Sequence, residues 1–246
     1  GIVSGFCNSI GGGGSGCDTN FIGAGSCNRA NGRNSGILAG ENNIVCNRYT
    51  IIGGGYGNTA SGFYGGVFSG RGNTSSAVYS GILGGYGNVV TGYSAGGVAG
   101  FGNQISGSMS IVGGGMYNCS TNCWSSVLGG CKNVASGIFS SVVGGCGNSA
   151  TGYGSFIGGG IGNINNSDSN VINGGCANTI NGFLSNIGGG LQNVMCSGYS
   201  NISGGRINSI NCNVCYSNIG GGYLNTINDI YSTISGGAQN TICSGV

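Results

Sequence analysis

The sequence predicts an all-β fold, a parallel β-solenoid of about sixteen coils, each about 15 residues long with two short strands per coil. Three observations predict it. An Asn returns at a constant spacing, apolar residues alternate with polar residues or Gly around that Asn, and Gly accounts for 61 of the 246 residues while Pro is absent. Gly at this density disfavours helix, because each Gly costs about 1 kcal/mol relative to Ala.

The Asn repeat sets the length of a coil. From Asn28 to Asn208 the repeated Asn residues follow one another at the same spacing without interruption. The interval from Asn8 to Asn28 is longer than this spacing, and so is the interval from Asn208 to Asn225. The same phrase therefore runs through the whole chain, with two intervals that are longer than the rest.

The two longer intervals predict loop insertions near residues 11–16 and 211–216 of an otherwise regular stack. We expect residues 1–246 to form a single β-solenoid repeat domain. The chain begins and ends inside the repeated phrase. We therefore expect it to be a fragment of a longer protein.

Each coil contains two short runs of alternating character. At the sixth position before the Asn comes an aliphatic residue, such as Ile82 or Ile202, and at the second position after it comes another small or aliphatic residue, such as Val90 or Ile180. This period of two predicts strands that place Ser or Asn, the aliphatic residue and Gly on one face. Equivalent residues of successive coils would then stack about 4.8 Å apart.

The repeated Asn residues have two interpretations. Stacked amides can form a hydrogen-bonded ladder along the coils, as in other cross-β stacks. Alternatively, each Asn occupies a left-handed turn. We favour the ladder, whose members would be Asn58, Asn73, Asn88, Asn103, Asn118, Asn133, Asn148, Asn163, Asn178, Asn193, Asn208, Asn225 and Asn240.

An apolar stripe occurs at the fifth position before the Asn. If the strands alternate as predicted, this position points outward, and a contiguous outward apolar stripe is typical of an interface. The alternative is that the strand phase is shifted by one position in these coils, so that the stripe belongs to the core. The candidate interface residues are Leu38, Phe68, Leu83, Val98, Leu128 and Val143.

Aromatic residues gather at the second turn of the coil, at the fifth or sixth position after the Asn. There they could contact sugars or another chain. Alternatively, they cover the corners of the coils or pack between protomers. The candidate ligand-facing aromatics are Tyr64, Tyr79, Tyr93, Trp124, Tyr153 and Tyr199.

The composition argues against several classes of function. The chain has no His, and its four carboxylates (Asp18, Glu41, Asp168 and Asp229) belong to different coils. We therefore predict no enzyme activity, no catalytic residue, no metal and no cofactor. Six basic and four acidic residues are scattered along the chain, which argues against a nucleic-acid partner. No apolar run is long enough to insert into a membrane.

Thirteen Cys residues cannot all pair within the chain. Cys131 and Cys146 fall at the same position of adjacent coils, where the expected separation lies within disulfide range. Their redox state is left open, because disulfides form outside the cell and free thiols persist in a cytoplasm.

The repeated phrase is approximately Ser-x-Ile-x-Gly-Gly-x-x-Asn-x-Ile-x-Gly-x-x, and Ser185–Tyr199 is one coil of it. It resembles the head repeats of YadA-like trimeric autotransporter adhesins and related repeats of phage and viral fibres. Those repeats are one position shorter and have Ala where this chain has Asn. The resemblance covers nearly the whole chain. It implies a left-handed β-roll that forms a homotrimer on a cell or virion surface.

These features together predict an extracellular surface fibre or adhesin segment whose partners are copies of itself and a glycan or protein of a host surface. Two alternatives remain open. Thr59, Thr74 and later residues one position after the Asn form a partial hydroxyl column, which is typical of ice-binding solenoids. The solenoids could also stack end to end as a filament, since no capping sequence is evident. Such a filament would serve as a passive spacer or sheath.

Overall fold

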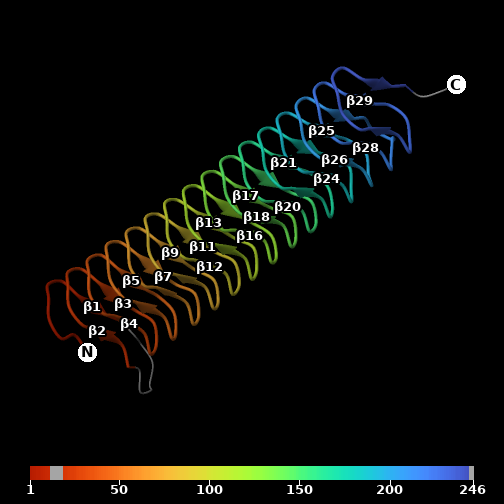
Figure 1. The fold of residues 1–246 in the computed structure, drawn as a ribbon. Coiled ribbons are helices and arrows are strands. Elements are labelled where there is room, and N and C mark those ends of the chain that lie inside the picture. The colour runs from red at the N-terminus through yellow and green to blue at the C-terminus, as the bar shows by residue number, and fades with distance from the viewer. Residues whose placement is uncertain (12–18, 244–246) are drawn as a thin grey trace. The chain divides into compact units, whose positions relative to one another are not determined.

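In the computed structural model, residues 1–11 and 19–243 are described, and their regular secondary structure consists of two-residue β-strands (Figure 1). No described residue lies in a helix. The all-β prediction is therefore confirmed. The insertion predicted near residues 11–16 and the carboxylate Asp18 lie outside the described residues, apart from Gly11.

The residues fall into two compact units, Gly1–Trp124 (unit 1) and Ser125–Val246 (unit 2). Within each unit the even-numbered strands form one parallel sheet, here named the even sheet, and the odd-numbered strands form another, the odd sheet. That residues 1–246 form a single domain stays a prediction.

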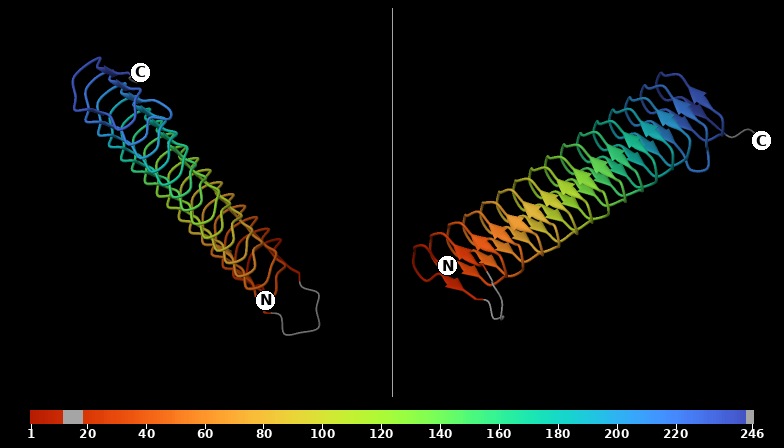
Figure 2. Two further views of the ribbon diagram at one scale, coloured as in Figure 1. Left: turned by 90° about the vertical axis from the view of Figure 1, so that its right-hand side faces the viewer. Right: turned by 90° about the horizontal axis from the view of Figure 1, so that it is seen from below.

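Each coil of unit 1 contributes one strand to each sheet (Figure 2). The even strands are β2 (Phe21–Ile22), β4 (Gly36–Ile37), β6 (Ile51–Ile52), β8 (Gly66–Val67), β10 (Gly81–Ile82), β12 (Gly96–Gly97) and β14 (Ile111–Val112). The odd strands are β1 (Ser9–Ile10), β3 (Arg29–Ala30), β5 (Ile44–Val45), β7 (Thr59–Ala60), β9 (Thr74–Ser75), β11 (Val89–Val90), β13 (Gln104–Ile105) and β15 (Cys119–Ser120).

Unit 2 repeats this arrangement. Its even strands are β16 (Ser126–Val127), β18 (Ser141–Val142), β20 (Phe156–Ile157), β22 (Val171–Ile172), β24 (Asn186–Ile187), β26 (Asn201–Ile202), β28 (Asn218–Ile219) and β30 (Thr233–Ile234). Its odd strands are β17 (Val134–Ala135), β19 (Ser149–Ala150), β21 (Ile164–Asn165), β23 (Thr179–Ile180), β25 (Val194–Met195), β27 (Ser209–Ile210), β29 (Thr226–Ile227) and β31 (Thr241–Ile242).

Strand pairing joins equivalent residues of successive coils. Ile82 of β10 pairs with Gly97 of β12, which holds the same position one coil later. A third row of single parallel bridges, such as Tyr86 with Phe101, runs along the coils beside the two sheets. Equivalent positions therefore stack on one another, and the parallel β-solenoid with two short strands per coil is confirmed.

The strands alternate as the sequence predicts. In nearly every strand the first residue is exposed or half-buried and the second is buried, as with Gly81 and Ile82 in β10. The second residues of the two sheets form the narrow core, which is closed to solvent at Ile157, Ile187 and Ile210. The outer faces of the sheets are consequently made by the first residue of each strand and the residue that follows the strand.

Gly allows the coils to approach closely. Gly85 has a φ of +92°, and a Cβ atom at this position would lie 2.2 Å from the backbone oxygen of Gly100 in the next coil. A side chain is therefore excluded here both by backbone conformation and by space. This explains why the second Gly of the Gly-Gly pair returns in so many coils.

The insertion predicted near residues 211–216 forms a turn at which Asn213 has a φ of 65°. The stack continues across it, because Ile202 still pairs with Ile219 although the insertion lengthens the chain between them. A disulfide joins Cys196 to Cys212 in the next coil. The added residues thus leave the coil as a surface loop without disturbing the register.

Candidate functional site

The repeated Asn residues form a continuous hydrogen-bonded ladder within each unit. The Oδ1 atom of Asn88 accepts hydrogen bonds from the backbone N–H and the side-chain Nδ2 of Asn103, both at 3.0 Å. The Nδ2 atom of Asn88 donates to the backbone oxygens of Gly84 and Gly100. Most ladder residues are buried, so they hold the coils together from inside and do not face a ligand.

The alternative interpretation placed each repeated Asn in a left-handed turn. Left-handed residues do occur, but at other positions of the coil. Bulky residues at the sixth position after the Asn have positive φ, including Tyr64 (57°), Tyr79 (58°) and Trp124 (53°). Such a conformation costs a non-Gly residue about 1 kcal/mol or more. The aromatic corners are therefore held in a conformation that Gly, as at Gly154, adopts without this cost.

The candidate aromatics of unit 1 cover one another. Tyr64 is stacked between Tyr49 and Tyr79, with ring centroids 4.8 and 5.3 Å apart, and Tyr93 meets Tyr79 edge-on at 5.8 Å. Trp124 is half exposed at the same corner. Because neighbouring rings occupy both faces of Tyr64, only its edge and hydroxyl group can meet a partner.

In unit 2 the candidate aromatics behave similarly. Tyr153 packs edge-on against Phe139 at 5.6 Å. Tyr199 stacks on Tyr216 at 4.9 Å, and Tyr216 stacks in turn on Tyr231 at 5.1 Å. The corner of unit 2 thus carries two groups of packed rings, with the coil of Ser169 between them.

The candidate interface stripe points outward in both units, and none of its residues is buried. Phe68 is 70% exposed and Leu83 59% exposed, while Leu38 and Val98 are also exposed. In unit 2, Leu128 and Val143 are exposed as well. The alternative, in which the stripe belongs to the core, is wrong.

An apolar groove of about 350 Å³ lies beside the stripe on the even sheet of unit 1. Its floor includes Gly66, Gly81 and Gly96, the first residues of three successive strands. Ile51 and Ile111 hold the equivalent positions in the strands on either side and close its two ends. A smooth apolar channel with no charged lining residue therefore runs next to the Phe68, Leu83 and Val98 ridge.

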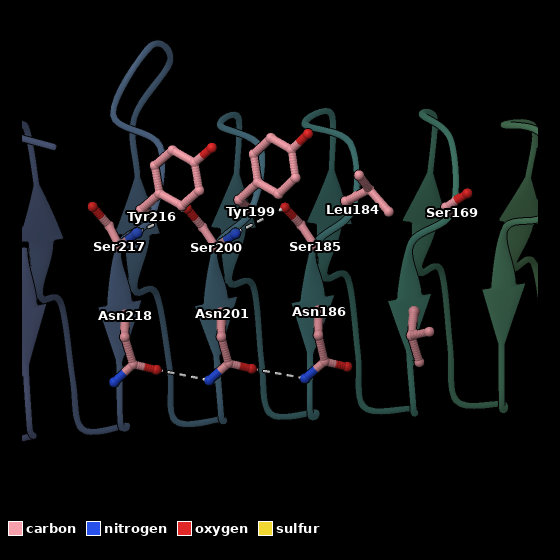
Figure 3. A pocket seen from close by; sticks show the side chains of 11 residues that line it. Ser169, Leu184, Ser185, Asn186, Tyr199, Ser200, Asn201, Tyr216, Ser217 and Asn218 are labelled. Atoms are coloured by element: carbon pink, nitrogen blue, oxygen red, sulfur yellow. Dashed lines mark hydrogen bonds between the residues drawn. The ribbon is translucent and has the colours of Figure 1, made fainter. Parts of the chain in front are cut away.

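The equivalent face of the even sheet in unit 2 carries Ser and Asn side chains beside apolar and aromatic ones. There a groove of about 680 Å³ crosses successive coils between residues 169 and 218 (Figure 3). Figure 3 shows three rows along it, with bulky residues at the corner, Ser in the middle and Asn on the far side. The rows are Leu184, Tyr199 and Tyr216; Ser185, Ser200 and Ser217; and Asn186, Asn201 and Asn218.

The Asn row of this groove is a second, outward-facing amide ladder. Asn186 donates from Nδ2 to Oδ1 of Asn201, and Asn201 donates in the same way to Asn218, both at 2.8 Å. Sequence reasoning missed this ladder because it examined only the Asn that repeats throughout the chain. The signal was present in the phrase Ser-Asn-Ile, which occurs in three successive coils beginning at Ser185, Ser200 and Ser217.

The hydroxyl column of the odd sheet is short. Thr59 pairs directly with Thr74, but the next partner of Thr74 is Val89. Gln104 and Cys119 follow along the same sheet. The Thr residues therefore form two separate pairs and a single Thr179 within the described strands, and not an extended array.

The carboxylates in the described residues make local contacts. Asp168 accepts a hydrogen bond from the backbone of Tyr153 at 2.8 Å, and Asp229 accepts one from the backbone of Ile230 at 2.9 Å. Over residues 1–11 and 19–243, no three His, Cys, Asp or Glu side chains cluster as metal ligands would, and no helix is long and apolar enough to cross a membrane.

The thiols of Cys131 and Cys146 lie opposite each other on adjacent coils and are both free. Burial raises the pKa of the Cys119 thiol, which lies half-buried on the odd sheet. No redox function follows from these positions.

No protein-family model matches the chain, and no curated protein matches it significantly. The two surfaces of the even sheet differ in character, since the groove of unit 1 is lined by apolar residues and Gly and that of unit 2 carries a row of amides.

Proposed function

We propose that this chain is a structural segment of an extracellular surface fibre, on a cell or virion, in which copies of the chain associate side by side and the assembled fibre attaches to a host surface. The observation that carries the proposal is the exposed apolar face of unit 1. Phe68, Leu83 and Val98 form a ridge there, directly beside the Gly-floored groove. An exposed apolar patch of this kind is typical of an interaction site.

The occupant that we favour for this face is a second copy of the chain. A ridge of large side chains next to a channel with no side chains on its floor is complementary to itself, since the ridge of one copy can enter the groove of another. No charged residue lines the groove, so two copies bring no like charges together. The resemblance to trimeric adhesin heads favours three copies.

Lateral association also fits the narrow core. Each coil of a solenoid buries only a few apolar side chains, here one per strand, such as Ile82 and Val90. Covering the outer apolar face would bury further area in every coil that carries the stripe, at about 25 cal/mol per Å².

The experiment is the oligomeric state of the full chain, measured by sedimentation equilibrium for the wild type and a Phe68→Asp/Leu83→Asp variant. We expect the wild type to sediment as a trimer of the 23.9 kDa chain and the variant as a monomer, because two buried carboxylates would face an apolar groove. Ile161→Asp is the matched control. Ile161 is 60% exposed in unit 2, outside both grooves, and this change should leave the trimer intact.

Three results would count against this proposal. A monomeric wild type would remove lateral association. A trimer that survives both Asp substitutions would place the interface elsewhere. Long, heterogeneous filaments in electron micrographs, with no discrete trimer, would favour the passive spacer or sheath.

A further inference from the structure

We propose that the uncharged groove of unit 2 binds a neutral, linear polysaccharide that lies along the stacked coils. This inference names the ligand class for the attachment role proposed above, and depends on that role only for the claim that the fibre binds a surface. It is carried by the geometry of the groove between Ser169 and Asn218.

The groove runs along the stack and repeats once per coil. Its three rows contribute an equivalent side chain from successive coils, which are spaced by about 4.8 Å. A polymer of similar units, extended along the groove, meets equivalent side chains in each coil. The sugar rings of an extended β-1,4-linked glycan advance by a similar length per unit, with successive rings turned to opposite sides.

The outer amide ladder leaves hydrogen-bonding groups for a ligand. An Asn side chain has two donor hydrogens and two acceptor lone pairs. The ladder bonds leave the Oδ1 atom of Asn186 and the Nδ2 atom of Asn218 with no hydrogen-bond partner in the described part of the chain. These acceptor and donor groups suit sugar hydroxyls, which both donate and accept.

The fold itself does not require this ladder. At the same strand position in unit 1 stand Gly66, Gly81 and Gly96, and their strands pair in the same parallel register. The main Asn ladder, of which Asn193 is a member, already joins the coils of unit 2 from inside. The coils can therefore stack without the outer amides, which contribute to the surface of the groove.

The opposite wall is formed by Tyr residues at the left-handed corner that recurs in both units. Tyr199 and Tyr216 have φ values of 52° and 62°, in the left-handed region that bulky residues avoid. Gly154 holds the position equivalent to Tyr199 in another coil of unit 2. Because Tyr64 and Tyr79 of unit 1 share this conformation, it belongs to the coil, and the feature specific to the groove is the placement of two Tyr rings beside the outer amides.

The absence of charge among the lining residues selects a neutral ligand. The groove is lined by Ser, Asn, Tyr, Leu and Val, with no Lys, Arg, Asp or Glu. An anionic glycan or a nucleic acid would find no cation there to balance its charge. An extended neutral peptide is the competing class. Tyr edges and hydroxyls next to separate amides favour the polyhydroxyl ligand.

The test is isothermal titration of the full chain with three neutral hexasaccharides: cellohexaose, chitohexaose and mannohexaose. We expect at least one to bind, and binding to weaken at least tenfold in Asn218→Leu and in Tyr216→Ala. Asn173→Leu is the matched control, since Asn173 is exposed on the same sheet but does not line the groove. Its affinity should match that of the wild type. Thermal unfolding of each variant identifies any loss caused by misfolding, and Tyr216→Phe, which removes only a hydroxyl group, provides a second, milder change.

The proposal is overturned if none of the three hexasaccharides binds, or if binding is unaffected by both groove substitutions. It is also overturned if a neutral Gly-Ser peptide of similar length binds in an Asn218-dependent way while the sugars do not. These outcomes are separate from those for lateral association. The Phe68→Asp/Leu83→Asp variant should lose the trimer and still bind sugar, because its substitutions lie in unit 1.

Discussion

The Oδ1 atom of Asn73 accepts two hydrogen bonds from Asn88 of the next coil, one from the backbone N–H at 2.9 Å and one from Nδ2 at 3.1 Å. One side chain thus fixes both the backbone and the side chain of its successor. Asn88 does the same for Asn103. The ladder keeps successive coils in register through amide and backbone groups that are buried.

Asn88→Ala should destabilise unit 1 by about 3 kcal/mol. The substitution leaves the backbone N–H of Asn103 without its acceptor, removes one acceptor of its Nδ2, and removes the Nδ2 donor from the oxygens of Gly84 and Gly100. Each buried polar group that loses its partner costs about 1–3 kcal/mol, partly offset by local relaxation. Urea unfolding measures the change in free energy, and hydrogen exchange locates it in the coils around Asn88.

Asn173→Ala is the control for this ladder substitution. Asn173 is exposed, and its side chain makes no hydrogen bond within the described residues. Its removal should change stability by less than about 0.5 kcal/mol. Equal effects of the two substitutions would mean that the buried ladder does not stabilise the stack.

Ile157→Ala and Ile161→Ala should differ strongly although the two residues lie close together in one coil. Ile157 is fully buried, so truncation should cost about 2–5 kcal/mol. Ile161 is 60% exposed and should cost less than about 0.5 kcal/mol. Thermal unfolding of both variants measures the two losses of stability. Similar losses would contradict the inward and outward assignment of the strands.

Much of the fold was predictable because the chain repeats its phrase. The spacing of Asn28 to Asn208 indicated the coil length, and alternation around residues such as Ile82 indicated the inward face, since a period of two leaves only two orientations. The outward stripe at Leu83 followed from the same rule. These features depend on local pattern, which a single sequence displays.

The details of the surfaces were not predictable in the same way. That Tyr64 is stacked between Tyr49 and Tyr79 depends on side-chain conformations at a left-handed corner, which the alternation rule does not describe. The outer ladder through Asn201 depends on three neighbouring coils sharing a residue at a variable position. Each groove forms where neighbouring coils have similar residues at the same position. It can therefore be recognised only when the coils are stacked on one another.

Cys119 should react more slowly with iodoacetamide than Cys46, which lies exposed on the odd-sheet side of unit 1. Burial raises the pKa of the Cys119 thiol, so at pH 8 a smaller fraction is the reactive thiolate. Its alkylation rate should continue to rise with pH above the range expected for a free thiol. Pulsed alkylation followed by peptide mass spectrometry measures both rates. Equal labelling at every pH would show that Cys119 is not buried as described.

Gly137→Ala and Gly144→Ala provide the sharpest test of coil spacing, because both replace a Gly with a negative or extended φ in the same coil of unit 2. A Cβ atom on Gly137 would lie 2.0 Å from the backbone oxygen of Gly152 in the next coil, while a Cβ atom on Gly144 meets nothing within 4 Å. Gly137→Ala should cost at least about 2 kcal/mol, since the obstacle is backbone and cannot rotate away. Gly144→Ala should be neutral or stabilise by about 0.5 kcal/mol, because Ala restricts the unfolded chain. Urea unfolding of the two variants compares them directly. If Gly137→Ala is as stable as Gly144→Ala, the coils cannot be packed as closely as the stacked Asn and Gly positions require.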